Sequence, residues 1–236
     1  MPYPIRETID EAGPSNRVIG KIYRVAFIMS LIAGYINSAM LIEFGIPVSQ
    51  MSGVASHLSD HLLHQQNDLL LQTAMILFGF VFGAFLSGLL IGITPYKQTP
   101  NYGHALLLNA LLLILSAWAS WKMSSLTLLT TAIACGLQNA LVASYRGLQL
   151  RTTHMTGNAT DIGVHLALCF KYRRKWNWRS NILLILMISY VLGGILGIIC
   201  FRQFPALSLL IPAAIMLILG VAYLFSYYRT PQKNIG

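Results

Sequence analysis

Charged residues are scarce in this sequence. Only 10% of its 236 residues are Asp, Glu, Lys or Arg, whereas 56% are hydrophobic. A soluble globular domain has about 25% charged residues, and the mean hydropathy of +0.63 is equally far from that class. The deficit excludes a soluble domain and predicts an all-α, polytopic membrane protein, because helices satisfy their own backbone hydrogen bonds inside a bilayer.

Reactive motifs are also missing. The three cysteines lie singly in or beside apolar runs and have no CxxC spacing: Cys135, Cys169 and Cys200. We therefore interpret them as small buried hydrophobic residues. The sequence has no HExxH or GxSxG motif and no pair of intramembrane aspartates placed as a catalytic dyad. We therefore predict no enzymatic activity, no catalytic residue and no cofactor.

Acidic residues are outnumbered by basic ones, 7 to 16, which gives a net charge of +9. Such a charge can serve nucleic-acid binding, but that function requires a continuous basic stripe. Here the basic residues lie between apolar segments, as they do at the cytoplasmic flanks of membrane helices. The predicted partner is therefore the lipid bilayer and not nucleic acid.

Long apolar runs are abundant. About 20 helical residues cross a hydrocarbon core of about 30 Å, and six runs are long enough: 24–46, 69–93, 104–121, 126–145, 181–201 and 207–228. They predict one transmembrane domain over 23–228, between a polar cytoplasmic tail at 1–22 and a short cytoplasmic tail at 229–236.

Two further segments, 47–66 and 147–170, are more polar. They are predicted to be re-entrant half-helices or buried crossings, the latter giving up to eight spans. Eight spans divide the Lys and Arg residues into 12 inside and 4 outside, whereas six spans divide them into 14 and 2. The positive-inside rule favours six spans, and both topologies place the two termini in the cytoplasm.

The two polar segments share a sequence frame. In this frame Met51, Ser52, Gly53, Ser56 and His61 correspond to Met155, Thr156, Gly157, Thr160 and His165. The correspondence extends to the preceding apolar helix, where Asn37 matches Asn139, and to a glycine-bearing helix that follows. The chain is therefore predicted to consist of two repeats, about 23–121 and 126–228, which six spans would relate by inversion.

These polar segments are the predicted functional centre. Gly53 and Gly157 supply backbone freedom. A helix that starts inside the membrane can be capped by the side-chain oxygen of Ser52, Thr156 or Asn158. Such a start presents unpaired N–H groups and the positive end of the helix dipole, which suit an anion or a polar solute. The predicted solute-binding residues are Asn37, Ser52, Gly53, Ser56, Asn139, Thr156, Gly157, Asn158, Thr160 and Asp161.

Titratable residues concentrate in the same segments. Four titratable side chains share one face of the first predicted helix: His57, Asp60, His61 and His64. Side chains at this spacing can ligate a metal ion or pass protons. The second copy retains only Asp161 and His165 on such a face, so no metal site is predicted. Proton coupling is assigned to Asp60, His61, Asp161 and His165, with Asp161 paired either with His165 or with the helix start.

Glycines recur at the spacing that brings membrane helices close together. GxxxG occurs at Gly79 and Gly83, at Gly88 and Gly92, and at Gly193 and Gly197. Small residues at this spacing let helix backbones approach where lipid gives no hydrophobic drive for association. The pattern predicts helix packing, and it permits a homodimer through the glycine-rich helices.

The motif residues resemble a known bacterial family. The chain is similar over about 25–225 to the YoaK-like integral membrane proteins, the domain of unknown function 1275 family. The similarity lies in the segments 33–37 (AGYIN), 136–140 (GLQNA) and above all 151–161 (RTTHMTGNATD). The first motif differs from the family's Met-Thr-Gly-Asn, since it ends in Gly53-Val54, and Asn37 stands where Asp is more frequent. The resemblance implies a bacterial inner-membrane location and no established activity.

Together these features predict a transporter or channel for a small polar or anionic solute, acting where the two polar segments meet. The alternative is a non-transporting membrane scaffold or sensor, in which the same polar residues hold helices together. A wet cavity lined by Thr156, Asn158 and Asp161 would favour transport, and a dry hydrogen-bonded contact would favour the scaffold.

Overall fold

Helices form every regular element of the computed structural model in its described residues, 15–92, 99–122, 125–143 and 151–229. They are α1 (Asn16–Phe44), α2 (Met51–Leu63), α3 (Asn67–Ile91), α4 (Asn101–Ser120), α5 (Ser125–Ala143), α6 (Met155–Tyr172), α7 (Trp178–Gln203), α8 (Pro205–Ser208) and α9 (Leu210–Arg229). The predicted all-α class is confirmed.

Six of these helices are long and apolar enough to cross a membrane, namely α1, α3, α4, α5, α7 and α9. They contain 19 to 29 residues, and at 1.5 Å per residue each is about 28 to 44 Å long. The six predicted apolar runs are therefore confirmed. The helix α1 begins at Asn16, about two turns before the predicted start of the first run.

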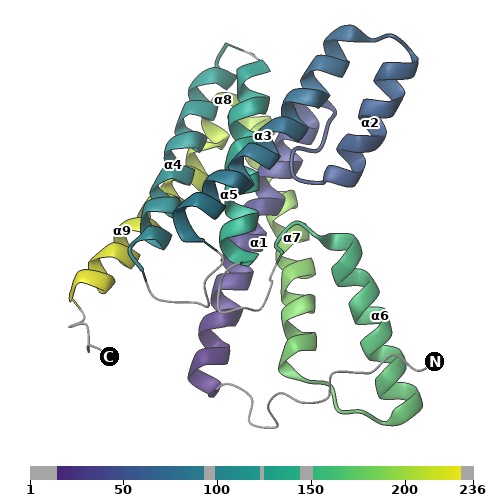
Figure 1. Ribbon diagram of the computed structural model, residues 1–236, viewed down its shortest axis with the longest axis vertical. Coiled ribbons are helices and arrows are strands. Elements are labelled where there is room, and N and C mark those ends of the chain that lie inside the picture. The colour runs from purple at the N-terminus through teal and green to yellow at the C-terminus, as the bar shows by residue number, and fades with distance from the viewer. Residues whose placement is uncertain (1–14, 93–98, 123–124, 144–150, 230–236) are drawn as a thin grey trace.

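The two polar segments form the helices α2 and α6. With 13 residues, α2 is about 20 Å long and too short to cross a hydrocarbon core. Figure 1 shows that α2 runs from the middle of the bundle to one end, where the chain turns back into α3, and that α6 runs from the middle to the opposite end, where the chain turns into α7. We call α2 and α6 the half-helices. The described residues thus contain six helices long and apolar enough to cross a membrane, two half-helices and the four-residue α8.

Two pairs of crossing helices are packed backbone to backbone. In one pair α1 lies along α7, and a Cβ added at Gly34 or Gly193 would fall on the carbonyl of Tyr190 or Leu31. In the other pair α3 lies along α5, and a Cβ at Gly83 would fall on a backbone carbonyl of α5. These glycines permit van der Waals contact between main chains, which is how membrane helices gain attraction without a hydrophobic drive.

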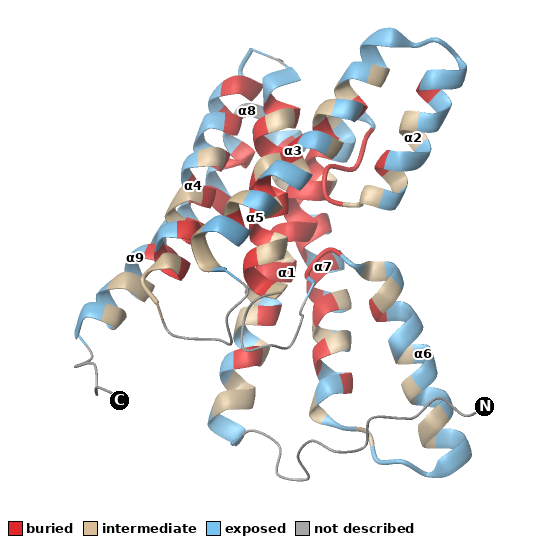
Figure 2. Cartoon of the chain, in the orientation of Figure 1, coloured by how far each residue is buried: buried red, intermediate tan, exposed pale blue. Residues whose placement is uncertain are grey.

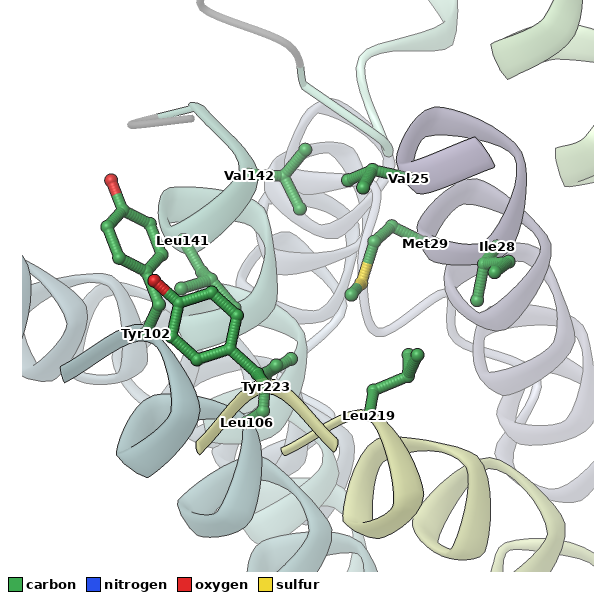
Figure 3. A pocket seen from close by; sticks show the side chains of 9 residues that line it. All are labelled: Val25, Ile28, Met29, Tyr102, Leu106, Leu141, Val142, Leu219 and Tyr223. Atoms are coloured by element: carbon green, nitrogen blue, oxygen red, sulfur yellow. The ribbon is translucent and has the colours of Figure 1, made fainter. Parts of the chain in front are cut away.

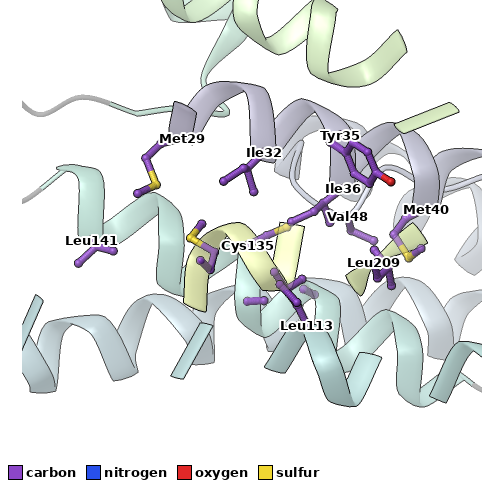
Figure 4. Close-up of a cluster of buried hydrophobic side chains, with 14 of the residues drawn as sticks. Met29, Ile32, Tyr35, Ile36, Met40, Val48, Leu113, Cys135, Leu141 and Leu209 are labelled. Atoms are coloured by element: carbon purple, nitrogen blue, oxygen red, sulfur yellow. The ribbon is translucent and has the colours of Figure 1, made fainter. Parts of the chain in front are cut away.

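The apolar core lies between these helices. Figure 4 shows Met29, Ile32 and Ile36 of α1 directed toward α5 and α4, which contribute Cys135 and Leu113. On the far side of α4, α9 completes the bundle. Cys135 is buried as predicted, whereas Cys169 and Cys200 are partly exposed.

The predicted use of GxxxG glycines for helix packing is visible within the single chain. Four of these glycines face the backbone of another helix of the same chain: Gly79, Gly83, Gly193 and Gly197. They are therefore not available to a second copy. Gly88 and Gly92 have no neighbouring atom within 4 Å of an added Cβ, so their spacing is not used for packing among the described residues.

Labelling from the two sides of the membrane should distinguish the turns that follow the two half-helices. Gln66 and Arg173 are both exposed, and the half-helices that precede them end at opposite ends of the bundle (Figure 1). In a cysteine-free background we expect an impermeant maleimide to label Gln66→Cys in intact cells, but Arg173→Cys only after the inner face is opened. Labelling of Gln66→Cys only after opening would instead support eight spans.

Candidate functional site

The start of α2 is fixed to α1 and α7. After α1 ends at Gly45, whose φ of 71° lies in the left-handed region, the chain turns back into the bundle. The side-chain Oδ1 of Asn37 accepts hydrogen bonds from the Ser49 backbone N–H (3.0 Å) and hydroxyl (2.9 Å). The Tyr190 hydroxyl lies 3.3 Å from the Ser49 hydroxyl and accepts from the Gln50 amide at 3.3 Å. The first residue of α2 is thereby held near the middle of α7.

The start of α6 is fixed by equivalent interactions. The Thr153 hydroxyl donates to the side-chain oxygen of Asn139 on α5 at 3.2 Å. The Ser30 hydroxyl of α1 lies 3.3 Å from the Thr152 carbonyl and 2.7 Å from the Leu186 carbonyl of α7. A single hydroxyl thus joins α1, α7 and the segment that enters α6.

The structure brings the two half-helix starts together. Tyr190 of α7 contacts Ser49 before α2, and Leu186 of α7 is linked through the Ser30 hydroxyl to the Thr152 carbonyl before α6. Leu186 and Tyr190 are four residues apart, which is about 6 Å along a helix. Figure 1 shows the first turns of α2 and α6 facing each other beside the middle of α7. Along their lengths the half-helices diverge, because α2 packs on α3 and α6 packs on α7. The meeting point is therefore confined to the two helix starts.

Further along, each half-helix is fastened to the crossing helix that follows it. The Nδ1 atom of His61 lies 2.9 Å from the Thr73 hydroxyl of α3. The Nδ1 atom of His165 lies 2.8 Å from the Ser180 hydroxyl of α7. The sequence predicts proton coupling for both histidines, and the structure places each of them in a contact between helices.

The predicted side-chain caps are wrong. The helices begin at Met51 and Met155, one residue before Ser52 and Thr156, and the N-cap residues Gln50 and His154 make no side-chain cap bond. The hydroxyls one turn later donate to the carbonyls four residues back, from Ser56 to Ser52 and from Thr160 to Thr156. Serine and threonine bond in this way when they lie inside a helix.

The prediction that Gly53 and Gly157 supply special backbone freedom is also wrong. Among the described glycines only Gly45 and Gly92 have positive φ, so Gly53 and Gly157 lie in the first turn with ordinary helical backbone. A Cβ at Gly157 would meet the imidazole of His154, an exposed side chain that would have to rotate away. At Gly53 the nearest atom would be Pro47 Cγ at 3.2 Å.

The absence of caps leaves hydrogen-bond donors at both helix starts. Among the described residues, the N–H groups of Ser52, Gly53, Thr156 and Gly157 have no acceptor. Asn158 is 7% exposed, and its Nδ2 also has no partner among them. Free N–H groups of a helix start attract negative charge, and they lie here at the positive end of each dipole.

The carboxylates occupy different environments. Asp60 lies at the outer end of α2 and forms a 3.1 Å pair with His64, both side chains being 59% exposed. Asp161 is exposed on α6, and within the described chain it makes no ion pair or hydrogen bond. The predicted pairing of Asp161 with His165 is therefore wrong, because the His165 ring is directed to Ser180 instead.

The clustered histidines do not form a metal centre in the part of the chain that the structure describes. The His57 and His61 rings lie with their centroids 5.6 Å apart. Asp60 and His64 pair on the same helix. The described residues contain no group of three His, Cys, Asp or Glu side chains able to hold a metal ion.

The predicted solute-binding residues separate into two sets. Asn37 and Asn158 are buried, and Asn139, Gly53 and Gly157 are partly buried. The others lie on the exposed outer faces of the half-helices: Ser52, Ser56, Thr156, Thr160 and Asp161. Figure 2 shows these faces as largely exposed.

Two cavities in the described structure lie away from the half-helices. One, of about 150 Å³, is bounded by α1, α4, α5 and α9 and lined by Val25, Ile28, Met29, Tyr102, Leu106, Leu141, Val142, Leu219 and Tyr223 (Figure 3). The other, between α1, α7 and α9, is lined mainly by aliphatic residues. None of the predicted solute-binding residues lines either cavity.

Several residues of the site were not predicted. Ser49 and Thr153 each lie two residues before the methionine that starts the shared frame, so extending the frame by two positions would have found them. Ser30 and Tyr190 lie in apolar runs, and no local pattern indicates that their hydroxyls contact a segment more than 120 residues away.

These features define a multi-pass α-helical membrane protein in which two half-helices start at the level of the middle of α7. The chain belongs to the family described as "Protein of unknown function (DUF1275)", whose profile matches residues 25–222. Comparison with curated proteins and with solved structures gave no match.

Proposed function

We propose that this protein is a transporter or channel for a small polar or anionic solute, which passes the paired starts of α2 and α6. The observation that carries the proposal is that two helix starts without side-chain caps lie at neighbouring levels of the middle of α7, because the α7 residues to which they are linked, Leu186 and Tyr190, are about 6 Å apart along that helix. Helix starts that meet near the membrane midplane are a recurrent plan of transporter sites. The proposal assigns no catalytic chemistry to the protein.

The proposal includes an inverted internal repeat. Equivalent contacts support it: Asn37 binds Ser49 as Asn139 binds Thr153, and the His61 contact to Thr73 matches the His165 contact to Ser180. The backbone contacts correspond as well, since Gly136 meets Phe80 on α3 as Gly34 meets Tyr190 on α7. In Figure 1 the corresponding helices α1 and α5 run in opposite directions, as inversion requires.

The solute class follows from the donors at the site. Two positive helix ends and their free N–H groups favour a ligand that accepts hydrogen bonds or carries negative charge. Asn158 adds an unpaired amide donor next to the α6 start. The carboxylate on α6, Asp161, lies six residues into that helix, or about 9 Å from its first residue. A small anion or a neutral polar molecule fits this arrangement better than a cation.

The bacterial inner membrane is the proposed location, with both termini in the cytoplasm. The first residues of α1 and the last residues of α9 lie at the same end of the bundle (Figure 1). The turn between α6 and α7, which carries Lys171, Arg173, Arg174, Lys175 and Arg179, lies at that end too. Clustered basic residues mark the cytoplasmic side.

One observation favours the alternative function of a membrane scaffold or sensor. Four polar residues of the two repeats have hydrogen-bond partners on neighbouring segments: Asn37, Asn139, His61 and His165. Such contacts stabilise membrane helices without any solute. This alternative predicts that the fold persists in the bilayer and that no solute crosses it.

A transport assay distinguishes these functions. Purified protein in proteoliposomes is screened against small anions and neutral polar solutes, and the variant Thr156→Val, Asn158→Leu is compared with the parent. We expect uptake to fall by about tenfold or more, because loss of a hydrogen bond to a charged ligand costs about 1.5–3 kcal/mol.

The matched control is Ser125→Ala, which removes an exposed hydroxyl from the first residue of α5, outside both half-helices. Its uptake should equal that of the parent. Equal uptake by the parent and by a folded Thr156→Val, Asn158→Leu variant would remove the helix starts from the solute path. Absence of uptake for every solute would support the scaffold.

A further inference from the structure

The outer faces of the half-helices differ from the rest of the bundle surface. Over their first nine residues, 51–59 and 155–163, the exposed residues are small or polar: Ser52, Ala55, Ser56 and Ser59 on α2, and Thr156, Ala159, Thr160, Asp161 and Gly163 on α6. We call these residues the half-helix face. By contrast, the exposed residues of α3 and α7 are large and apolar, among them Phe78, Val81, Phe85, Ile188, Val191 and Ile195. Lipid tails suit the second surface and not the first.

No other described element covers the half-helix face. In the described chain α2 packs on α3 and α6 packs on α7, while α4 and α9 lie at the opposite edge of the bundle (Figure 1). Figure 2 shows the half-helices largely exposed along their whole length. The face therefore points out of the bundle and not into a channel within one chain.

The depth of this face decides what can cover it. Both half-helices start near the middle of α7, and their first nine residues extend about 12 Å from that level. They remain inside a hydrocarbon layer that extends about 15 Å to either side of the midplane. Serine, threonine and especially Asp161 are unfavourable against lipid at that depth, so another protein surface must cover them.

We propose that the half-helix face binds the same face of a second copy of this chain. Each half-helix has small residues at the spacing i, i+3, i+4 and i+7, namely Ser52, Ala55, Ser56 and Ser59, and Thr156, Ala159, Thr160 and Gly163. This spacing lets two helices approach closely. A partner must present two short polar helices, one in each half of the membrane, and a second copy does so.

The symmetry of this dimer follows from the membrane. Two copies inserted in the same orientation are related by a two-fold axis along the membrane normal, so α2 meets α2 and α6 meets α6 of the partner. The four helix starts then converge at one depth, and the hydroxyls of Ser52 and Thr156 from both copies become enclosed. This interface does not require that the protein transports a solute, and it differs from the glycine contacts inside the chain.

Single cysteines test this interface in native membranes. The background is a cysteine-free variant that carries Cys135→Ala, Cys169→Ser and Cys200→Ser. In this background one residue of the half-helix face at a time is replaced by cysteine: Ala55, Ser56, Ala159 or Thr160. We expect a short permeant bismaleimide to shift at least one α2 variant and one α6 variant from 26.1 kDa to twice that mass. Ile218→Cys on α9 is equally exposed but lies at the far edge, and it should stay at the single-chain mass.

A second measurement uses the native cysteines. The parent in lipid nanodiscs should have the mass of two chains, and Gly163→Leu should reduce it to that of one. Gly88→Leu is the matched control, because Gly88, like Gly163, has no atom within 4 Å of an added Cβ. A single-chain mass for the parent, a cross-linked product with a different protein, or equal cross-linking of Ile218→Cys would overturn the proposal.

Discussion

Gly193→Ala should prevent stable folding of the membrane domain. The added Cβ would fall on the Leu31 carbonyl of α1, and neither backbone can move without separating α1 from α7. Overpacking a core costs about 1–3 kcal/mol even where side chains can yield. Here the clash is with main chain, so we expect a loss of about 3 kcal/mol or more. Melting followed by size-exclusion chromatography in mild detergent measures the effect.

Gly88→Ala is the matched control for this prediction. Gly88 lies in α3 with open space around its Cβ position. Alanine favours the helix over glycine by about 0.5–1 kcal/mol, so this variant should be as stable as the parent or slightly more stable. If Gly193→Ala melted at the same temperature as Gly88→Ala, the backbone contact between α1 and α7 would be wrong.

The arrangement of these close contacts means that the two halves of the chain depend on each other. The helix α1 of the first half packs on α7 of the second half, which follows the second polar segment. Likewise, α3 of the first half, which follows the first polar segment, packs on α5 of the second half. Each of the two tightest helix pairs therefore joins residues from before and after the middle of the sequence. Neither half can form its closest helix contact alone, so we expect them to fold as one unit.

Sequence periodicity is sufficient to predict the crossing helices but not their partners. The six apolar runs identify these helices because about 20 apolar residues in succession are typical of a membrane span. The glycines at 83 and 193 indicate that some backbone approaches closely, yet glycine has no side chain that specifies which helix does so. The pairing of α1 with α7 depends on contacts between residues about 160 positions apart, such as Leu31 and Gly193.

The half-helices show a second limit of sequence reasoning. Their existence follows from the polar frame, but the capping roles predicted within the first turn are wrong. A serine or threonine next to glycine is equally compatible with a cap and with a helix that begins one residue earlier. The structure favours the earlier start because Ser49 and Thr153 bind Asn37 and Asn139 and so fix the chain just before each methionine.

Asp161 is the residue on which proton coupling, if it accompanies transport, should depend. Asp60 and His64 pair with each other at the exposed outer end of α2, and His61 and His165 bind hydroxyls of the next helix. Asp161 has no hydrogen-bond or ion-pair partner among the described residues and lies about 9 Å along α6 from its first residue. The other titratable groups on α6 near it are His154, packed over Gly157, and His165.

Asp161→Asn should therefore fold normally and abolish the pH dependence of solute uptake. Asparagine preserves the size of the side chain and its capacity for hydrogen bonding but removes the ionisable group, so an effect confined to the pH profile indicates proton transfer and not support of the helix. The measurement is uptake into proteoliposomes between pH 5 and pH 8, the range of physiological proton switches. Asp60→Asn is the matched control, because its carboxylate is exposed at the outer end of α2, and its pH profile should equal that of the parent. A folded Asp161→Asn protein with an unchanged profile would exclude Asp161 from proton coupling.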